Sequence, residues 1–176
     1  MNRYAPCYQR GVSLIEVLVA VLIFSVGMIG MAGLLVMATR SNHTAYQRTQ
    51  VTFLAGAMAD RMRANPVGVW NGSYNGAYPV TGNIDCQTSA CSPLLLAQRD
   101  RQLWSSMLTT LLPNAGAAIS CQEANTLSYT VSADQINRRP PYGGHCALTI
   151  TWNERKAGDT ANRDTAAQTY AWEFQP

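Results

Sequence analysis

The sequence predicts an α+β protein in which a long N-terminal helix packs, through its second half, on a four-stranded antiparallel sheet with an additional helix. Three observations predict this fold. Residues 17–39 contain no charged side chain, residues 40–65 place apolar side chains at spacings of three and four, and apolar residues beyond position 116 recur at a spacing of two. The first spacing is typical of a helix with one buried face, and the second is typical of strands.

The composition limits the class of protein. The chain has 176 residues, enough for one domain of ordinary size, and only 13% of them are charged. Such a low charged fraction excludes a solvated disordered chain and a highly charged coiled coil. The net charge of +3 is small and scattered, so no nucleic-acid partner is expected.

The charge-free run of 23 residues at 17–39 predicts a single membrane span. As a helix it would be about 34 Å long, enough to cross a hydrocarbon core of about 30 Å. Two alternatives are a buried helix of a soluble protein and a secretory signal cleaved after Val36-Met37-Ala38. The span is favoured because soluble helices rarely run this far without a charged face.

The orientation of the span follows from the cysteines. Arginines flank both sides of the run, so the positive-inside rule does not decide the orientation. Four of the five cysteines lie beyond the span: Cys86, Cys91, Cys121 and Cys146. Disulfides form outside the cytoplasm, which predicts that the C-terminal region is exported.

Glu16 stands inside an otherwise apolar run. A carboxylate deep in a membrane costs on the order of 2.5–3.5 kcal/mol, so it needs a partner or must reach the interface.

Residues 10–20, R-G-V-S-L-I-E-V-L-V-A, resemble the signal of type IV prepilins and pseudopilins. That signal is a basic leader ending in glycine, followed by an apolar helix with glutamate at its fifth position. The resemblance implies that prepilin peptidase cleaves between Gly11 and Val12 and methylates the new amino group of Val12. It also implies that Glu16 pairs with such an amine and sets the axial register of assembling subunits. Val12 departs from the phenylalanine that is most frequent there.

Cleavage at this position would explain the odd cysteine. Loss of residues 1–11 removes Cys7, Arg3 and Arg10, which leaves four cysteines and reduces the net charge from +3 to +1.

The elements beyond the span are predicted in order. Val51, Leu54, Met58 and Met62 form one stripe on a helix that ends at Asn65-Pro66. A second helix begins after Ser92 and runs over residues 93–112. Its predicted buried side chains are Leu96, Leu103, Met107, Leu111, Trp104 and Leu108. Strands are predicted at 117–123, 127–132, 146–153 and 169–174, and the resemblance implies that these elements form the type IV pilin fold.

The segment 66–83 predicts a loop with two Asn-Gly turns and room for a short hairpin. Its aromatic side chains Trp70, Tyr74 and Tyr78 could bind a glycan, but packing against the head is favoured. Arg138 and Arg139 form a basic loop that is interpreted as solvated rather than as a phosphate site.

The head shows no pattern typical of catalysis. No G-x-S-x-G or comparable nucleophile motif occurs, so an enzyme is not expected. Four cysteines allow three pairings; Cys86 with Cys91 and Cys121 with Cys146 are favoured. Zinc ligation is the alternative, but the chain has no C-x-x-C pair, so no metal or other cofactor is expected.

Three head patterns resemble PilV-type minor pilins: D-R-M-R-A-N-P at 60–66, the helix with Asp100 and Trp104, and L-T-I-T-W-N-E at 148–154. Such proteins help to initiate the type IV pilus near its tip, with other minor pilins, the major pilin and a large PilY-type adhesin.

The expected division of the chain is a leader at 1–11, a membrane and filament-core half-helix at 12–39, an amphipathic half at 40–65 and an exported head at 66–176. The protein is expected to cross the inner membrane once, with its head exported, and then to move into the pilus at the cell surface. The alternatives are a pseudopilin of type II secretion and a signal-anchored periplasmic binding domain.

Overall fold

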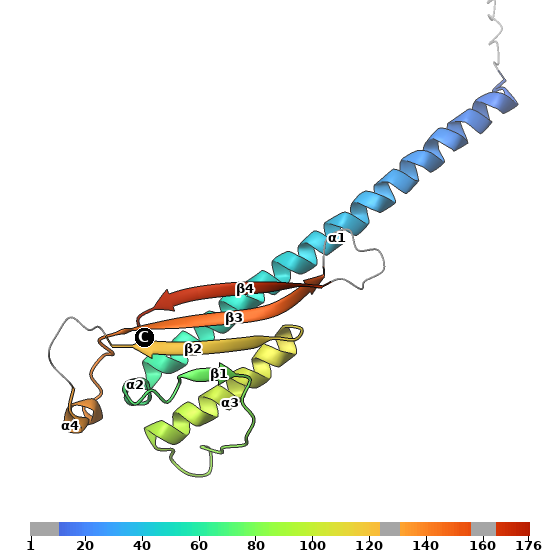
Figure 1. Ribbon diagram of the computed structural model, residues 1–176. Helices are drawn as coiled ribbons and strands as arrows, with labels where there is room; N and C mark the ends of the chain where they lie inside the picture. The colour runs from blue at the N-terminus through green and yellow to red at the C-terminus, as the bar shows by residue number, and fades with distance from the viewer. Residues whose placement is uncertain (1–10, 124–130, 156–164) are drawn as a thin grey trace, which may run out of the picture. The chain divides into compact units, whose positions relative to one another are not determined.

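The computed structural model describes residues 11–123, 131–155 and 165–176. The chain forms two compact units, Met1–His43 and Thr44–Pro176, and each is described by itself. The elements run in the order α1 (Leu14–Ala64), α2 (Pro66–Trp70), β1 (Gly76–Tyr78), α3 (Pro93–Leu111), β2 (Gly116–Gln122), α4 (Ala133–Asn137), β3 (His145–Arg155) and β4 (Thr165–Phe174) (Figure 1).

The described part of the first unit is the apolar half of α1. The helix begins at Leu14, two residues after the predicted start, and every residue from 11 to 43 is exposed. Within the described residues α1 is the one helix long and apolar enough to cross a membrane. Its most apolar window has a mean hydropathy of 2.5 and contains no buried residue.

The second unit contains the predicted four-stranded antiparallel sheet, with strand order β1-β2-β3-β4 (Figure 1). Strands β2, β3 and β4 correspond to the predictions at 117–123, 146–153 and 169–174. In the observed register, Leu148 of β3 lies between Ile119 of β2 and Trp172 of β4. The alternation of Cys146, Leu148, Ile150 and Trp152 is confirmed, because all four side chains are buried.

In the described part of the chain, the fourth strand of the sheet comes from a segment that was predicted as a loop. Residues 127–130 of the predicted strand lie outside the described residues, and Ser132 is the N-cap of α4. The sheet takes its fourth strand from the loop instead, because β1 pairs with β2 in the register Gly76 to Ile119. The Asn75 side chain supports this pairing by accepting a hydrogen bond from the Cys121 amide at 2.9 Å. Residues 66–83 thus contain one strand, β1, and not the short hairpin for which the sequence left room.

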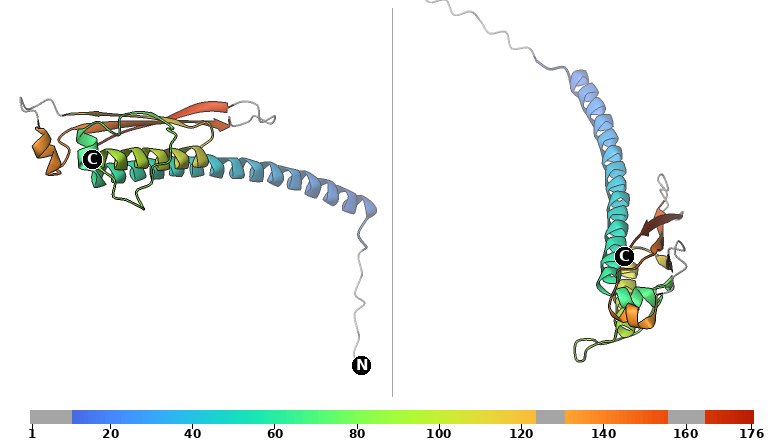
Figure 2. Two further views of the ribbon diagram at one scale, coloured as in Figure 1. Left: turned by 90° about the horizontal axis from the view of Figure 1, so that it is seen from below. Right: turned by 90° about the vertical axis from the view of Figure 1, so that its left-hand side faces the viewer.

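The second half of α1 and helix α3 lie side by side on one face of the sheet (Figure 2). The predicted stripe on α1 is confirmed, since Val51, Leu54, Met58 and Met62 are all buried. The indole N–H of Trp104 on α3 donates to the Leu54 carbonyl at 2.8 Å. These helices and the inner face of the sheet enclose one apolar core.

Helix α3 begins as predicted, with the Ser92 hydroxyl accepting from the Leu95 amide at 3.3 Å. Its buried face agrees with the prediction in part, because Trp104 and Leu108 are buried and Met107 and Leu111 pack against the core. Ala97, Asp100 and Ser105 are buried beside Trp104 and Leu108, whereas Leu103 is exposed. Polar contacts of Asp100 and Ser105 rotate the buried face away from the predicted leucine stripe.

Candidate functional site

The residues of the predicted processing signal lie at the start of α1. Val12 is 71% exposed and precedes the helix, and Glu16 lies in its first turn. The Glu16 amide donates to the Ser13 carbonyl at 3.0 Å. A carboxylate in the first turn is favoured by the partial positive charge of the helix N-terminus. If the helix extended back to Val12, the separation of four residues would place Val12 and Glu16 about 6 Å apart along its axis, and an amine on Val12 would be within reach of the carboxylate.

The helix after Glu16 presents apolar side chains all around its circumference. The large side chains of this unit are exposed, for example Leu22, Phe24 and Leu34. Water does not stabilise such a surface, so it has to be covered by lipid or by other apolar helices. This half of α1 can therefore serve as a membrane anchor and as the contact surface of a helical bundle.

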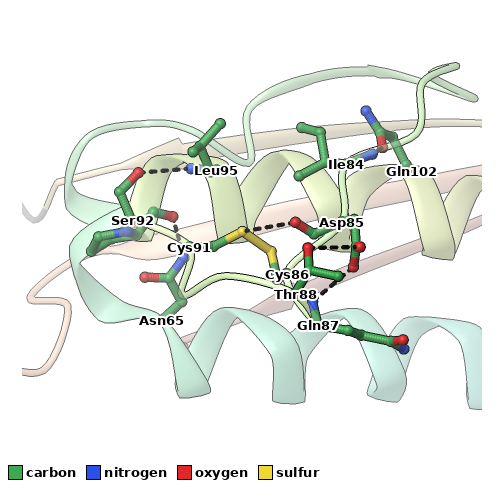
Figure 3. Close-up of a disulfide and its surroundings, with 11 residues drawn as sticks. Asn65, Ile84, Asp85, Cys86, Gln87, Thr88, Cys91, Ser92, Leu95 and Gln102 are labelled. Atoms are coloured by element: carbon green, nitrogen blue, oxygen red, sulfur yellow. Dashed lines mark hydrogen bonds between the residues drawn. A yellow bond between two sulfur atoms is a disulfide. The ribbon is translucent and has the colours of Figure 1, made fainter.

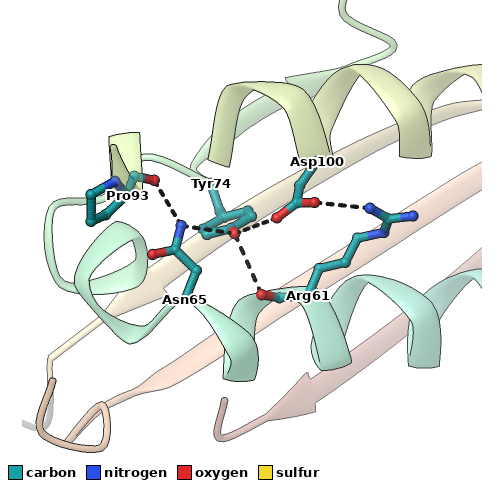
Figure 4. A network of polar contacts seen from close by, with 5 residues as sticks. All are labelled: Arg61, Asn65, Tyr74, Pro93 and Asp100. Atoms are coloured by element: carbon teal, nitrogen blue, oxygen red, sulfur yellow. Dashed lines mark hydrogen bonds and ion pairs between the residues drawn. The ribbon is translucent and has the colours of Figure 1, made fainter. Parts of the chain in front are cut away.

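A buried polar network joins α1, α3 and the loop between them (Figure 4). Arg61 and Asp100 form an ion pair with 2.9 Å between Nη1 and Oδ1. The Tyr74 hydroxyl donates to the other carboxylate oxygen of Asp100 at 2.8 Å and accepts from Asn65 Nδ2 at 3.2 Å. These contacts fix the end of α1 against α3 and hold the loop over both.

Asn65 marks the end of α1 and completes this network. Its side-chain oxygen accepts from the Gly68 amide at 3.2 Å, which caps α2, and its Nδ2 also donates to the Pro93 carbonyl at 2.7 Å. A Cβ on Gly68 would lie only 2.5 Å from Asn65 Nδ2. Position 68 therefore has to be glycine for the asparagine to approach.

The loop aromatics pack against the head, as the favoured interpretation holds. Tyr74 and Tyr78 are buried, and the Trp70 ring contacts Tyr142 edge to face at 4.9 Å between centroids. The Trp70 indole N–H donates to the Pro140 carbonyl at 3.1 Å. These rings are therefore part of the packed head and not an exposed glycan platform.

The tyrosine hydroxyls of this region titrate above their ordinary range. Burial raises the pKa of Tyr74, and the negative charge of Asp100 raises it further. Burial also raises the pKa of Tyr78 to about 12, while the Arg101 guanidinium, 5.2 Å from the ring centroid, opposes the shift. Burial and the nearby Glu123 raise the pKa of Tyr142.

The four head cysteines form two disulfides, Cys86–Cys91 and Cys121–Cys146. Cys121–Cys146 joins directly paired residues of β2 and β3. Cys86–Cys91 closes a small loop before α3 (Figure 3). Hydrogen bonds from the Gln87 amide and the Thr88 hydroxyl organise this loop, and they lower the pKa of the Asp85 carboxyl that accepts them.

Other chemistry is sparse in the described part of the chain. No group of three or more His, Cys, Asp or Glu side chains there could hold a metal ion. Two shallow hollows have volumes of about 270 and 310 Å³. Arg139 lines the first and Arg138 the second, and both arginines are exposed. Residues 158–164, which include two aspartates, lie outside the described residues.

Comparison with known families identifies one segment. Residues 7–32 match the family described as "Prokaryotic N-terminal methylation motif". No curated protein and no solved structure matches the chain. The match supports a type IV pilin-like protein that prepilin peptidase processes and an apolar helix anchors in the inner membrane. The long apolar helix and the four-stranded antiparallel sheet with additional helices are consistent with a type IV pilin-like α+β fold.

The residues of the N-terminal signal are apparent from the sequence, whereas the polar network is not. Asp100 and Trp104 were named only because their helix resembles that of PilV-type minor pilins, and no contact was predicted for either side chain. Tyr74 was interpreted only as an aromatic loop residue, and its partners Asn65 and Asp100 lie 9 and 26 residues away in the chain. The local sign of the network in the sequence was Asp100, an acid on the otherwise apolar side of the helix predicted at 93–112.

Proposed function

We propose that this protein is a minor pilin, a non-enzymatic structural subunit that helps to initiate type IV pilus assembly and lies at or near the pilus tip. The observation that carries the proposal is the methylation motif at residues 7–32, with Glu16 in the first turn of an exposed, charge-free half-helix. A helix of this kind is stable in lipid before assembly and among other such helices after it.

The proposed chemistry begins with the loss of residues 1–11. Prepilin peptidase cleaves the bond between Gly11 and Val12, and the freed amino group of Val12 is methylated and keeps its positive charge. Glu16 then pairs with this amine or with that of the neighbouring subunit. Burial of the pair among apolar helices removes it from water and strengthens the attraction, which fixes the axial position of the subunit.

The proposed division of the mature chain follows from this chemistry. Residues 12–39 form the membrane and filament-core half of the helix, residues 40–65 the amphipathic half, and residues 66–176 the exported head. The two disulfides of the head favour a compartment outside the cytoplasm.

The assignment to PilV-type minor pilins rests on the head patterns. Within these patterns, Arg61 and Asp100 form the ion pair between α1 and α3. The Trp104 indole N–H donates a hydrogen bond to the Leu54 carbonyl. The patterns thus mark contacts that hold the head on its helix, which supports their use as a family signature. The partners proposed on this basis are other minor pilins, the major pilin and a large PilY-type tip adhesin.

The same N-terminal motif also supports a second candidate, a pseudopilin of type II secretion. Deletion of the gene separates the two, because loss of twitching with normal protein export indicates a pilus subunit and the reverse indicates a pseudopilin. A signal-anchored periplasmic binding domain would keep its leader.

Mass spectrometry of the membrane-extracted protein tests the class. The expected mature chain begins at Val12 and carries one methyl group on its amino nitrogen. An intact leader, or a new N-terminus after Ala38, would overturn the proposal.

A further inference from the structure

The two edge strands of the sheet, β1 and β4, differ in length and in how well their outer edges are protected. The edge strand β1 has three residues, and Pro79 follows it. The chain beyond it is fastened to α3, since the Val80 amide donates to the Ser105 hydroxyl at 2.9 Å. The opposite edge, β4, has ten residues and pairs only with β3 among the described strands (Figure 1).

Strand β4 lacks the features that usually block an edge. Its sequence, T-A-A-Q-T-Y-A-W-E-F, contains no proline, glycine or lysine and a single charge, Glu173. An edge strand directs the backbone N–H and C=O groups of about half its residues away from the sheet. Long unprotected edges of this kind are templates for another strand.

The inner face of β4 extends the apolar core to this edge. Tyr170 pairs with Ile150 and Trp172 pairs with Leu148, and both β3 side chains are fully buried. The two aromatic side chains of β4 are only half-buried. A further strand beside β4 would therefore bury more of both rings with its own inward side chains.

The outer face supplies a charge. Glu173 is exposed, its cross-strand neighbour is Ala147, and no cation pairs with it among the described residues. Residues 165–174 contain no lysine or arginine, so the β4 strand of a second copy could not neutralise this carboxylate.

We infer that the β4 edge docks an extended segment of a different protein, which adds a fifth strand to the sheet. This segment carries apolar side chains facing Tyr170 and Trp172 and a lysine or arginine facing Glu173. Backbone hydrogen bonds supply the affinity of such strand addition, and the alternating side chains supply the specificity. The inference stands apart from the proposed function, because it uses only residues of the head.

The test uses the full chain in detergent micelles and synthetic ten-residue peptides of alternating valine and threonine. One peptide carries a lysine at a central threonine position, a second carries glutamate there, and a third has alternate backbone amides methylated so that it cannot pair. The lysine peptide should slow amide hydrogen exchange in residues 165–174 and leave β1 unchanged, whereas the methylated peptide should not bind.

A charge exchange separates strand addition from non-specific binding. In the wild type the lysine peptide should bind up to about fivefold more tightly than the glutamate peptide, as expected for one exposed ion pair. Glu173→Lys should reverse this preference. Ser120→Lys is the matched control, because Ser120 lies in the same cross-strand row, two strands and about 10 Å away, and it should leave the preference unchanged.

Three results would overturn the inference. One is unchanged exchange in β4 at the highest soluble concentration of the lysine peptide, and another is a peptide preference that Glu173→Lys does not move. The third is protection of β4 that rises with protein concentration in the absence of peptide, which would make a second copy the occupant.

Discussion

Arg61 of α1 and Asp100 of α3 form an ion pair at 2.9 Å, and the same carboxylate accepts the Tyr74 hydroxyl. The Asp100 side chain is 9% exposed and that of Arg61 is 29% exposed. One carboxylate thus satisfies two donors from separate segments in a largely dry environment. Its removal leaves a partly buried guanidinium without this acceptor and leaves the buried Tyr74 hydroxyl only the long contact with the Arg61 carbonyl at 3.4 Å. This is more costly than the loss of a surface pair.

The first prediction is that Asp100→Ala lowers the free energy of unfolding by about 2–3 kcal/mol. Chemical denaturation of the full chain in detergent, followed by tryptophan fluorescence, measures this change. Asp60→Ala is the matched control, because Asp60 pairs with Arg63 at 3.0 Å on the exposed surface of α1. It should cost about 0.5 kcal/mol or less, and equal losses in the two variants would contradict the assigned role of the network.

The second prediction concerns assembly. Glu16→Val should insert into the membrane and fold as the wild type does but be depleted from sheared filaments by about tenfold or more, as expected for the loss of at least about 1.4 kcal/mol of pairing. Glu16→Gln, which keeps the shape and removes the charge, should fail in the same way. Thr39→Val, a polar-to-apolar change in the same half-helix, should assemble normally. Immunoblots of sheared and membrane fractions give the ratio, and normal incorporation of Glu16→Gln would remove the role of the charge.

Regular periodicity explains which elements could be predicted from the sequence. The buried stripe on α1 and the alternation of Cys146, Leu148 and Ile150 follow directly from helix and strand geometry. Strand β1 has only three residues and no alternation of its own, so its place depends on pairing with β2, about 40 residues further along the chain. A local pattern cannot contain that information.

The candidate site also has one part that the sequence predicts and one part that it does not. Gly11, Val12 and Glu16 lie within six consecutive residues, so a short stretch of sequence carries their resemblance to a prepilin-type signal. The polar network depends on contacts between residues that lie 9 to 39 positions apart. Asp100 is buried on α3 although a helix ordinarily buries its apolar side chains. Its partners are the partly buried Arg61 and the buried Tyr74, which only the tertiary structure brings to it.

The third prediction compares the two disulfides. Replacing Cys121 and Cys146 together by alanine should destabilise the head by about 3 kcal/mol, and replacing Cys86 and Cys91 by about 2 kcal/mol, because the first pair constrains the longer loop of the unfolded chain. The sequence separations are 25 and 5 residues. Thermal unfolding of the two double variants ranks them, and a larger loss for the Cys86–Cys91 pair would contradict this order.

The fourth prediction follows from the buried tyrosines. Burial raises the pKa of Tyr78 to about 12, and the pKa of Tyr74 shifts in the same direction. Unfolding returns both hydroxyls to an ordinary pKa of about 10. Their contribution to stability is therefore complete below about pH 10 and is lost as the pH rises towards the folded value, because the unfolded chain releases these protons first.

The loss due to Tyr78 should approach about 1.4 kcal/mol per pH unit within this window. Tyr78→Phe keeps the ring against Trp104, at 5.2 Å between centroids, and removes the titrating group. This variant should be less stable than the wild type at neutral pH, because the hydroxyl no longer donates to the Tyr74 carbonyl at 2.6 Å. Its stability should nevertheless fall less steeply above about pH 10. Denaturation curves at several alkaline pH values give both slopes, and parallel slopes would show that Tyr78 is already ionised in the folded protein.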